Sequence, residues 1–235
     1  MKVAIYLNND ERFFCHKWID YCEQNHISYK LVNVYDSRII EHVDDCDAFM
    51  WHFSQNDYRD LLFAKQLMYS LQMSGKKVFP DFNTLWHFDD KIGQKYLLES
   101  ICAPLVSSYV FYTQKEAEEW IGRATFPKVF KLRNGGGSTN VKLAKTKRQA
   151  MALTRRAFGK GFVHFNRWNN LKEKIYMYKS GKGCFYEIVK GIGRLFIPTS
   201  FTRMYKREKG YVYFQDFIPD NDHDVRLIVI GGTKA

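Results

Sequence analysis

The chain has 235 residues, of which 46% are hydrophobic and 17% aromatic, a composition that supplies a large core and excludes a disordered protein. No apolar run is long enough to span a membrane, and Met1 and Lys2 precede a strand-like run rather than a signal peptide. The formal charge of +11 is uneven: residues 145–209 hold 17 Lys and Arg against three acids, a net +14, which indicates an anionic partner or a solvated basic face.

The cysteines are scattered along the chain and form no metal-binding pattern. Their number is odd, and no two of them have the short spacing of a zinc knuckle. We therefore expect reduced thiols and a cytoplasmic location. The five residues are Cys15, Cys22, Cys46, Cys102 and Cys184.

The first 86 residues alternate strand-like apolar runs with segments of helical spacing. Phe14, Trp18 and Cys22, for example, recur every four positions, as on one face of a helix, and we expect such aromatic positions to lie in the core. This βαβ rhythm predicts an α/β domain in which a small parallel sheet has helices on both faces. The predicted strands are 2–7, 29–35, 47–53 and 76–80, and the predicted helices are 11–25, a short one after residue 35, and 57–73.

Residues 87–160 predict a linker helix followed by a compact α+β unit. Two of the helices begin with the pattern of a capping box, Thr113 with Glu116 and Thr146 with Gln149. The linker helix has Asp89 and Asp90 near its start, where negative charge is favourable. The predicted elements are helix 87–100, strand 107–113, helix 113–122, hairpin 126–143 and helix 146–159.

The hairpin 126–143 has a glycine-rich tip, residues 135–138, between two alternating runs, and Lys131 stands on one face of its first strand. Because the glycines join strand to strand, this is neither a P-loop nor a dinucleotide-binding loop, both of which open a helix. Bare backbone N–H groups at such a tip can approach an anion closely. The alternative interpretation is a plain glycine-rich turn.

The last third of the chain is basic and mainly helical before it returns to strands. Residues 167–193 have a helical pattern broken by Gly-Lys-Gly at 181–183. Residues 211–219 and 224–232 predict two further strands, the second of which stops at a Gly-Gly turn. The sequence ends at Ala235, where we expect another strand to begin.

The order of a lysine-bearing strand, a glycine-rich hairpin, a capped helix and the segment "FQDFIPDNDHDVRLIVIGGTKA" resembles the ATP-grasp superfamily, and within it the RimK-type ligases that add amino acids to carboxyl groups. The resemblance implies a pre-ATP-grasp domain in 1–86, a linker helix and small lid subdomain in 87–160, and a basic helical segment with the start of an incomplete C-terminal lobe in 161–235. It also implies an enzyme that binds ATP between two α+β lobes, activates a carboxylate as an acylphosphate, and joins it to an amine or thiol.

The resemblance further implies which residues bind ATP. Lys131 and Lys91 would contact the phosphates, with Lys95, one helical turn further on, as the alternative to Lys91. Asp224 would contact the ribose hydroxyls, and Arg226 would act as the catalytic residue at the phosphate or acylphosphate. The remaining expected ATP-binding residues are those of the loop that closes over the phosphates, Gly135, Gly136, Gly137 and Ser138, and those of the adenine-reading hinge, Gln215, Asp216, Phe217 and Ile218.

One departure from the family concerns the metal. Family members bind Mg²⁺ through an aspartate and a Glu-x-Asn pair well C-terminal to the hinge, and hard cations need such oxygen ligands. We expect these ligands to lie C-terminal to residue 235 in a longer enzyme, and this chain to be inactive by itself. The basic segment 145–209 indicates an acidic small molecule or peptide as substrate, and a homo-oligomer is compatible with these features.

Two other classes of protein remain open. The first is a nucleotide-binding module that holds ATP and performs no chemistry. The second is a nucleic-acid-binding protein, which would use the basic segment and the aromatic residues within it. No recognised nucleic-acid motif supports that second interpretation, so a nucleic-acid partner is disfavoured. The aromatic residues are Trp168, Tyr176, Tyr178, Phe185 and Tyr186.

Overall fold

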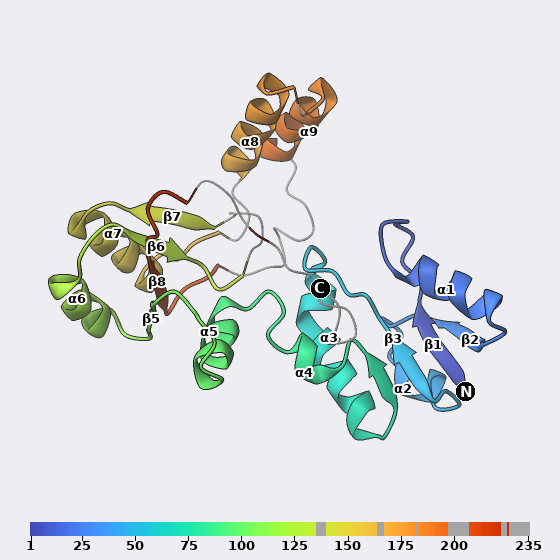
Figure 1. Ribbon diagram of the computed structural model, residues 1–235. Coiled ribbons are helices and arrows are strands. Elements are labelled where there is room, and N and C mark those ends of the chain that lie inside the picture. The colour runs from blue at the N-terminus through green and yellow to red at the C-terminus, as the bar shows by residue number, and fades with distance from the viewer. Residues whose placement is uncertain (135–139, 164–166, 182, 197–206, 222–224, 226–235) are drawn as a thin grey trace.

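The computed structural model describes residues 1–134, 140–163, 167–181, 183–196, 207–221 and 225. Two four-stranded sheets form the core of the described chain. Figure 1 shows them on opposite sides of the molecule, with helix α5 (Lys91–Ser100) between them. The structure therefore combines an α/β part with an α+β part, as the sequence predicted. Six predicted site residues lie outside the described residues, namely Gly135, Gly136, Gly137, Ser138, Asp224 and Arg226, and so does the predicted strand 224–232 except for Val225.

The N-terminal sheet is parallel throughout and has the strand order β2-β1-β3-β4. Its two faces are covered by different helices, because Val3 and Ile5 pack against α1 while Ala4, between them, faces the cluster that includes α2 and α3. This arrangement confirms the predicted α/β sheet. The elements are β1 (Lys2–Tyr6), α1 (Cys15–Gln24), β2 (Ser28–Val32), α2 (Ile39–His42), β3 (Ala48–Met50), α3 (Tyr58–Met73) and β4 (Lys77–Phe79).

The first helix differs from its predicted form. It begins at Cys15 rather than at residue 11. Phe14 precedes it and is 53% exposed, so the expectation that this aromatic position lies in the core was wrong. The helix turns Cys15 and Cys22 toward the sheet instead, and Trp18 packs against the same cluster. Phe14 stacks on His52 instead of packing in the core, with ring centroids 4.7 Å apart.

The second sheet is antiparallel and has the order β5-β8-β6-β7. The predicted hairpin supplies β6 and β7. Of each predicted capping box the N-cap half forms, because the Thr113 hydroxyl accepts from Glu116 N–H and the Thr146 hydroxyl from Gln149 N–H, whereas the Gln149 side chain accepts from Lys145 N–H instead. We predicted strand β8 as part of the segment 161–235, but its hydrogen bonds place it between β5 and β6. The elements are β5 (Ser108–Phe111), α6 (Gln114–Arg123), β6 (Lys128–Lys131), β7 (Val141–Ala144), α7 (Lys147–Phe158) and β8 (Val212–Asp216).

The connection between the two sheets contains one helix that the sequence did not predict, α4 (Phe82–Leu85), and α5, which begins four residues later than expected. Asp90 determines the start of α5, because its carboxylate accepts hydrogen bonds from the N–H groups of Ile92 and Gly93 at 3.1 and 2.9 Å. The connection is also attached to α3. The Lys65 ammonium donates to the carbonyl of Phe88 at 2.9 Å, and to that of Trp86 at 2.7 Å.

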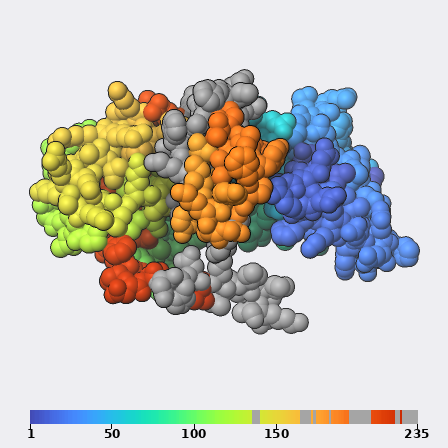
Figure 2. All heavy atoms as spheres, turned by 90° about the horizontal axis from the view of Figure 1, so that it is seen from above, coloured from blue at the N-terminus to red at the C-terminus, as the bar shows by residue number. Residues whose placement is uncertain are grey.

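The basic segment forms a helical hairpin of α8 (Arg167–Lys179) and α9 (Phe185–Phe196), which Figure 1 shows standing away from both sheets. Seen from above in Figure 2, these helices, in orange, lie over the middle of the molecule. Gly191 permits their close contact, since a Cβ there would lie 3.1 Å from the Leu171 side chain. Among the described helices, none combines the length and the apolar character that a membrane crossing requires.

Strands β6 and β8 are tied by an ion pair between Lys128 and Asp216. Lys128 is only 7% exposed and lies over the Trp120 and Tyr109 rings, and Asp216 is its carboxylate partner. We expect Lys128→Met to lower the free energy of unfolding by about 1 to 2 kcal/mol, because the Asp216 carboxylate loses its buried partner but stays partly solvated. Urea denaturation measures this change.

A matched control for that variant is Lys30→Met. Lys30 also pairs with an aspartate, Asp45, at 3.1 Å, but at the surface. Exposed pairs contribute less than about 1 kcal/mol. Equal losses in the two variants would show that burial gives the Lys128 pair no added importance.

Candidate nucleotide-binding site

The two faces of strand β6 have different neighbours. Phe130 is 1% exposed and packs in the cluster formed with α6 and α7, with its ring centroid 5.1 Å from that of Phe162. Lys131 lies on the opposite face and is partly buried. The predicted alternation of the strand is therefore correct, and it turns the lysine away from the hydrophobic core.

A chain of hydrogen bonds fixes the position of Lys131. Its ammonium donates to Gln215 Oε1 at 2.5 Å, and the amide nitrogen of Gln215 donates to Ser108 Oγ at 2.9 Å. Ser108 Oγ also accepts from the Tyr213 hydroxyl at 3.0 Å and donates to the carbonyl of Val106 at 2.7 Å. All three strands β5, β8 and β6 thus hold the ammonium, and the amide orientation of Gln215 follows from its two neighbours.

The N-terminus of α5 lies beside the end of β6. The backbone N–H of Lys91 donates to the carbonyl of Arg133 at 2.9 Å, and Arg133 Nε lies 3.1 Å from an Asp90 carboxylate oxygen. Arg133 N–H in turn donates to the Tyr211 hydroxyl at 2.6 Å, which donates to Glu208 at 2.9 Å. These contacts join the linker helix to the hairpin strand and bring Lys91 near Lys131.

Burial makes the charged form of both lysines less favourable than in water. Burial lowers the pKa of Lys131, and the charge of Lys91 lowers it further. Burial also lowers the pKa of Lys91, although Asp89, Asp90 and Glu208 oppose that shift. A group with several negative charges placed here would stabilise the charged form of both ammonium groups.

The alternative lysine, Lys95, has different surroundings from Lys91. The ammonium of Lys95 lies 2.6 Å from a Glu99 carboxylate oxygen on the same helix, one turn further on. It is also 4.7 Å from the ring centroid of Tyr96. Lys95 thus has a carboxylate partner, and of the two lysines only Lys91 contributes to the electrostatic environment of Lys131.

The end of β8 presents a different set of groups. The Asp216 carboxylate pairs with Lys128 on the helix-covered face, and the Asp216 N–H donates to the carbonyl of Ser107 at 3.0 Å. Phe217 and Ile218 follow the strand and are 42% and 52% exposed. Two exposed apolar side chains at a strand end are suited to contact with a flat aromatic ring.

Sequence reasoning missed several residues that organise this site. Ser108 accepts a hydrogen bond from Gln215, and Lys128 forms an ion pair with Asp216. Tyr211 accepts a hydrogen bond from Arg133 N–H and donates one to Glu208. Each of these contacts joins segments far apart in sequence except that of Tyr211 with Glu208. No local pattern marks such residues, since they became recognisable only when the strand order placed β8 beside β5 and β6.

The lowered pKa of Lys131 leads to a prediction on proton uptake. In the nucleotide-free protein, the Lys131 ammonium loses its proton at a pH below the ordinary lysine pKa of 10.5. Bound phosphate raises the pKa of Lys131 again. At a pH between the Lys131 pKa of the free protein and the higher Lys131 pKa of the complex, ATP binding must take up a proton. The affinity for ATP therefore falls as the pH rises through this range. Calorimetry at alkaline pH in two buffers of different ionisation enthalpy measures the uptake. Equal binding enthalpies in the two buffers would contradict the prediction.

Comparison with known proteins identifies the fold. No protein-family model and no curated protein sequence matches this chain. Among solved structures, an ATP-grasp RimK-domain protein of Sphaerobacter thermophilus superposes with a TM-score of 0.50 at 17% identity, covering 93% of this chain and 65% of that protein. The biotin carboxylase domain of Hydrogenobacter thermophilus 2-oxoglutarate carboxylase gives 0.50 at 12% identity, covering 92% of this chain and 44% of that chain.

The chain therefore has the ATP-grasp fold, which confirms the sequence resemblance at the level of fold. It spans less than two thirds of the length of either protein. The biotin carboxylase domain was solved as a dimer with ADP, its magnesium salt and bicarbonate. In the described part of the present chain, no three His, Cys, Asp or Glu side chains are grouped so that they could hold a metal ion.

Proposed function

We propose that this protein is an ATP-dependent ligase that joins a carboxylate to an amine or thiol through an acylphosphate, as the RimK-type ligases do. The observation that carries the proposal is the pair of partly buried lysines, Lys91 and Lys131, held side by side by the contact of α5 with β6. Together with the ATP-grasp fold, this pair of cationic side chains is suited to the phosphates of ATP.

The proposed roles follow from the positions of the side chains. Lys131 and Lys91 hold phosphate oxygens, and their positive charges stabilise the charge that develops as the terminal phosphoryl group passes to a carboxylate. Gln215 positions Lys131 through its amide oxygen. Phe217 and Ile218 contact the adenine ring, and Asp216 acts through its backbone, since its carboxylate pairs with Lys128.

The remaining parts of the proposal extend beyond the described residues. Residues 135–138 close over the phosphates, Asp224 binds the ribose, and Arg226 contacts the acylphosphate. We propose domain boundaries at 1–86, 87–160 and 161–235. Mg²⁺ belongs to this chemistry, but the described residues offer no ligand cluster for it, so we assign the ion no ligand and no step.

The reaction products test the proposed function. The protein is incubated with Mg-ATP and a panel of amino acids, acidic peptides and sugar acids, and nucleotides are separated after the reaction. Release of ADP and phosphate that depends on a carboxylate and an amine supports the acylphosphate mechanism. Release of AMP and pyrophosphate would contradict it, because it requires an adenylated carboxylate. Tight ATP binding without any product across the panel would favour the nucleotide-binding module.

A further inference from the structure

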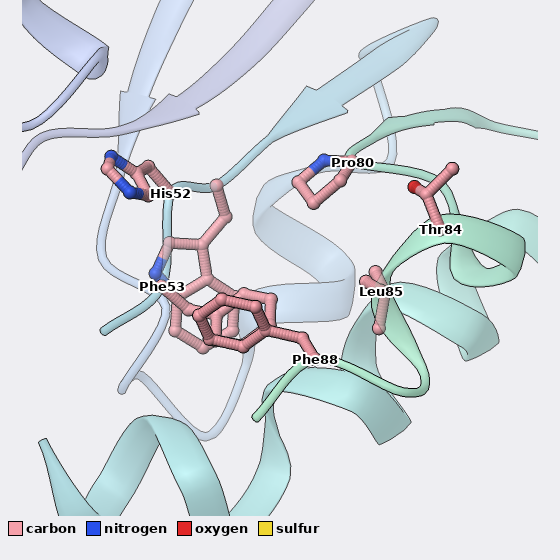
Figure 3. Close-up of a pocket in the computed structure, with 7 residues that line it drawn as sticks. His52, Phe53, Pro80, Thr84, Leu85 and Phe88 are labelled. Carbon is pink, nitrogen blue, oxygen red and sulfur yellow. The ribbon is translucent and has the colours of Figure 1, made fainter. Parts of the chain in front are cut away.

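A pocket of about 230 Å³ opens at the carboxyl edge of the N-terminal sheet. Trp51, His52 and Phe53 come from the segment after β3, and Pro80 directly follows β4. Figure 3 shows His52 and Phe53 on one side, Pro80, Thr84 and Leu85 on the other, and Phe88 between them. Ligands in open α/β sheets bind outside the carboxyl ends of the strands, so this edge is a favourable position for a substrate.

The size and lining of the pocket define the kind of group that fits. None of the seven lining residues is charged, and most present carbon atoms. A cavity of about 150 Å³ suffices for benzene, while pockets for whole drug-sized ligands begin at about 300 Å³. The pocket is therefore suited to one aromatic ring with a small substituent.

Two nitrogen-bearing rings, those of Trp51 and His52, stand in the lining of the pocket. Trp51 is fully buried, and its indole Nε1 has no hydrogen-bond partner among the described residues. His52 Nδ1 accepts from the backbone N–H of Phe14 at 3.2 Å, so neutral His52 carries its proton on Nε2. The ring is fixed by stacking on Phe14. The lining therefore presents mainly carbon atoms to an occupant.

The pocket lies close to the proposed phosphate site along the chain. Phe88 lines the pocket, and Lys91 is three residues further on, so their Cα atoms are at most about 11 Å apart. The Lys65 ammonium holds the carbonyl of Phe88 at 2.9 Å and so fixes this wall of the pocket. A molecule of amino-acid size can therefore reach from the pocket toward the phosphates.

We propose that this pocket binds an aromatic side chain of the substrate beside the nucleotide site. The assignment of the occupant as substrate rests on the proposed function, whereas the binding of an aromatic group does not. The basic segment 145–209 indicates an acidic substrate, and this pocket indicates that the substrate also carries an apolar group. The carboxylate to be activated would then point out of the pocket toward Lys91.

Binding of benzamide to the purified full chain tests the inference, with acetamide as the probe that lacks the ring. We expect benzamide to bind at least about tenfold more tightly, since only its ring can fill the pocket. Thr84 is exposed at the pocket, so Thr84→Trp should fill the space and abolish benzamide binding without changing the melting temperature. Phe88→Ala should weaken binding about tenfold, while Tyr21→Ala, an exposed residue of α1 outside the pocket lining, should leave it unchanged.

The titrations are repeated with ATP on the same samples. The pocket assignment would be overturned if benzamide bound no more tightly than acetamide. It would also be overturned if benzamide bound Thr84→Trp and Phe88→Ala as tightly as the parent protein. Both outcomes hold independently of the result with ATP. Benzamide binding with the expected losses in both variants supports it. If benzamide binds and ATP does not, the pocket stands and the proposed function fails. Normal ATP binding by Thr84→Trp would show that the two sites are separate.

Discussion

The Lys131→Met variant is expected to bind ATP about ten- to a hundredfold more weakly than the parent protein. Its methylene stem remains, but the ammonium that donates to Gln215 and faces the proposed phosphate position is lost. A hydrogen bond to a charged group contributes about 1.5 to 3 kcal/mol, which corresponds to this range of affinity. Equilibrium titration with ATP measures the loss, and thermal unfolding checks that the variant is folded.

Lys142→Met is a matched control from the same hairpin. Burial lowers the pKa of Lys142 as it does for Lys131, but Lys142 pairs in register with Phe130 and lies over the Phe162 ring, on the helix-covered face. The ATP affinity of the Lys142→Met variant should stay within about twofold of the parent value. Similar losses in both variants would show that general positive charge, rather than this face of the sheet, attracts the nucleotide.

The Phe130→Ala variant is expected to lose about 3 to 5 kcal/mol of unfolding free energy, the largest stability effect that we predict. Phe130 is 1% exposed, and its ring lies 5.1 Å from Phe162 and 5.5 Å from Phe214. Truncation leaves a cavity among these rings, next to the residue that carries the proposed phosphate contact. Urea denaturation measures the change.

The control for this variant is Phe185→Ala on α9, where the ring is 62% exposed. We expect its unfolding free energy to change by less than about 0.5 kcal/mol. A loss below about 1 kcal/mol for Phe130→Ala would contradict the described core of the second sheet. It would indicate that Phe162 and Phe214 rearrange to fill the space.

Much of the fold follows from local sequence patterns. The βαβ rhythm predicted the parallel sheet, and the Thr-x-x-Glu and Thr-x-x-Gln patterns predicted the caps of α6 and α7, which form at Thr113 and Thr146. Such features depend on residues a few positions apart, so their physical causes are visible in the sequence. The alternation around Lys131 likewise predicted which face of β6 is buried.

Other features depend on distant residues and were not predictable. The insertion of β8 between β5 and β6 pairs Ser108 with Gln215, and the sequence contains no mark of that register. The ion pair of Asp216 with Lys128 follows from the same strand order. The pocket beside Phe88 was also missed, because its walls come from three separate segments of the N-terminal part.

The central claim is that the face of the second sheet that carries Lys131 and Gln215 binds ATP. Parallel equilibrium titrations of the chain with ATP and with GTP, each in the presence of Mg²⁺, test it most directly. The proposed hinge at Gln215–Ile218 predicts that ATP binds at least about tenfold more tightly than GTP, and that Lys131→Met removes most of this binding. Undetectable ATP binding, or equal affinity for the two nucleotides, would contradict the claim.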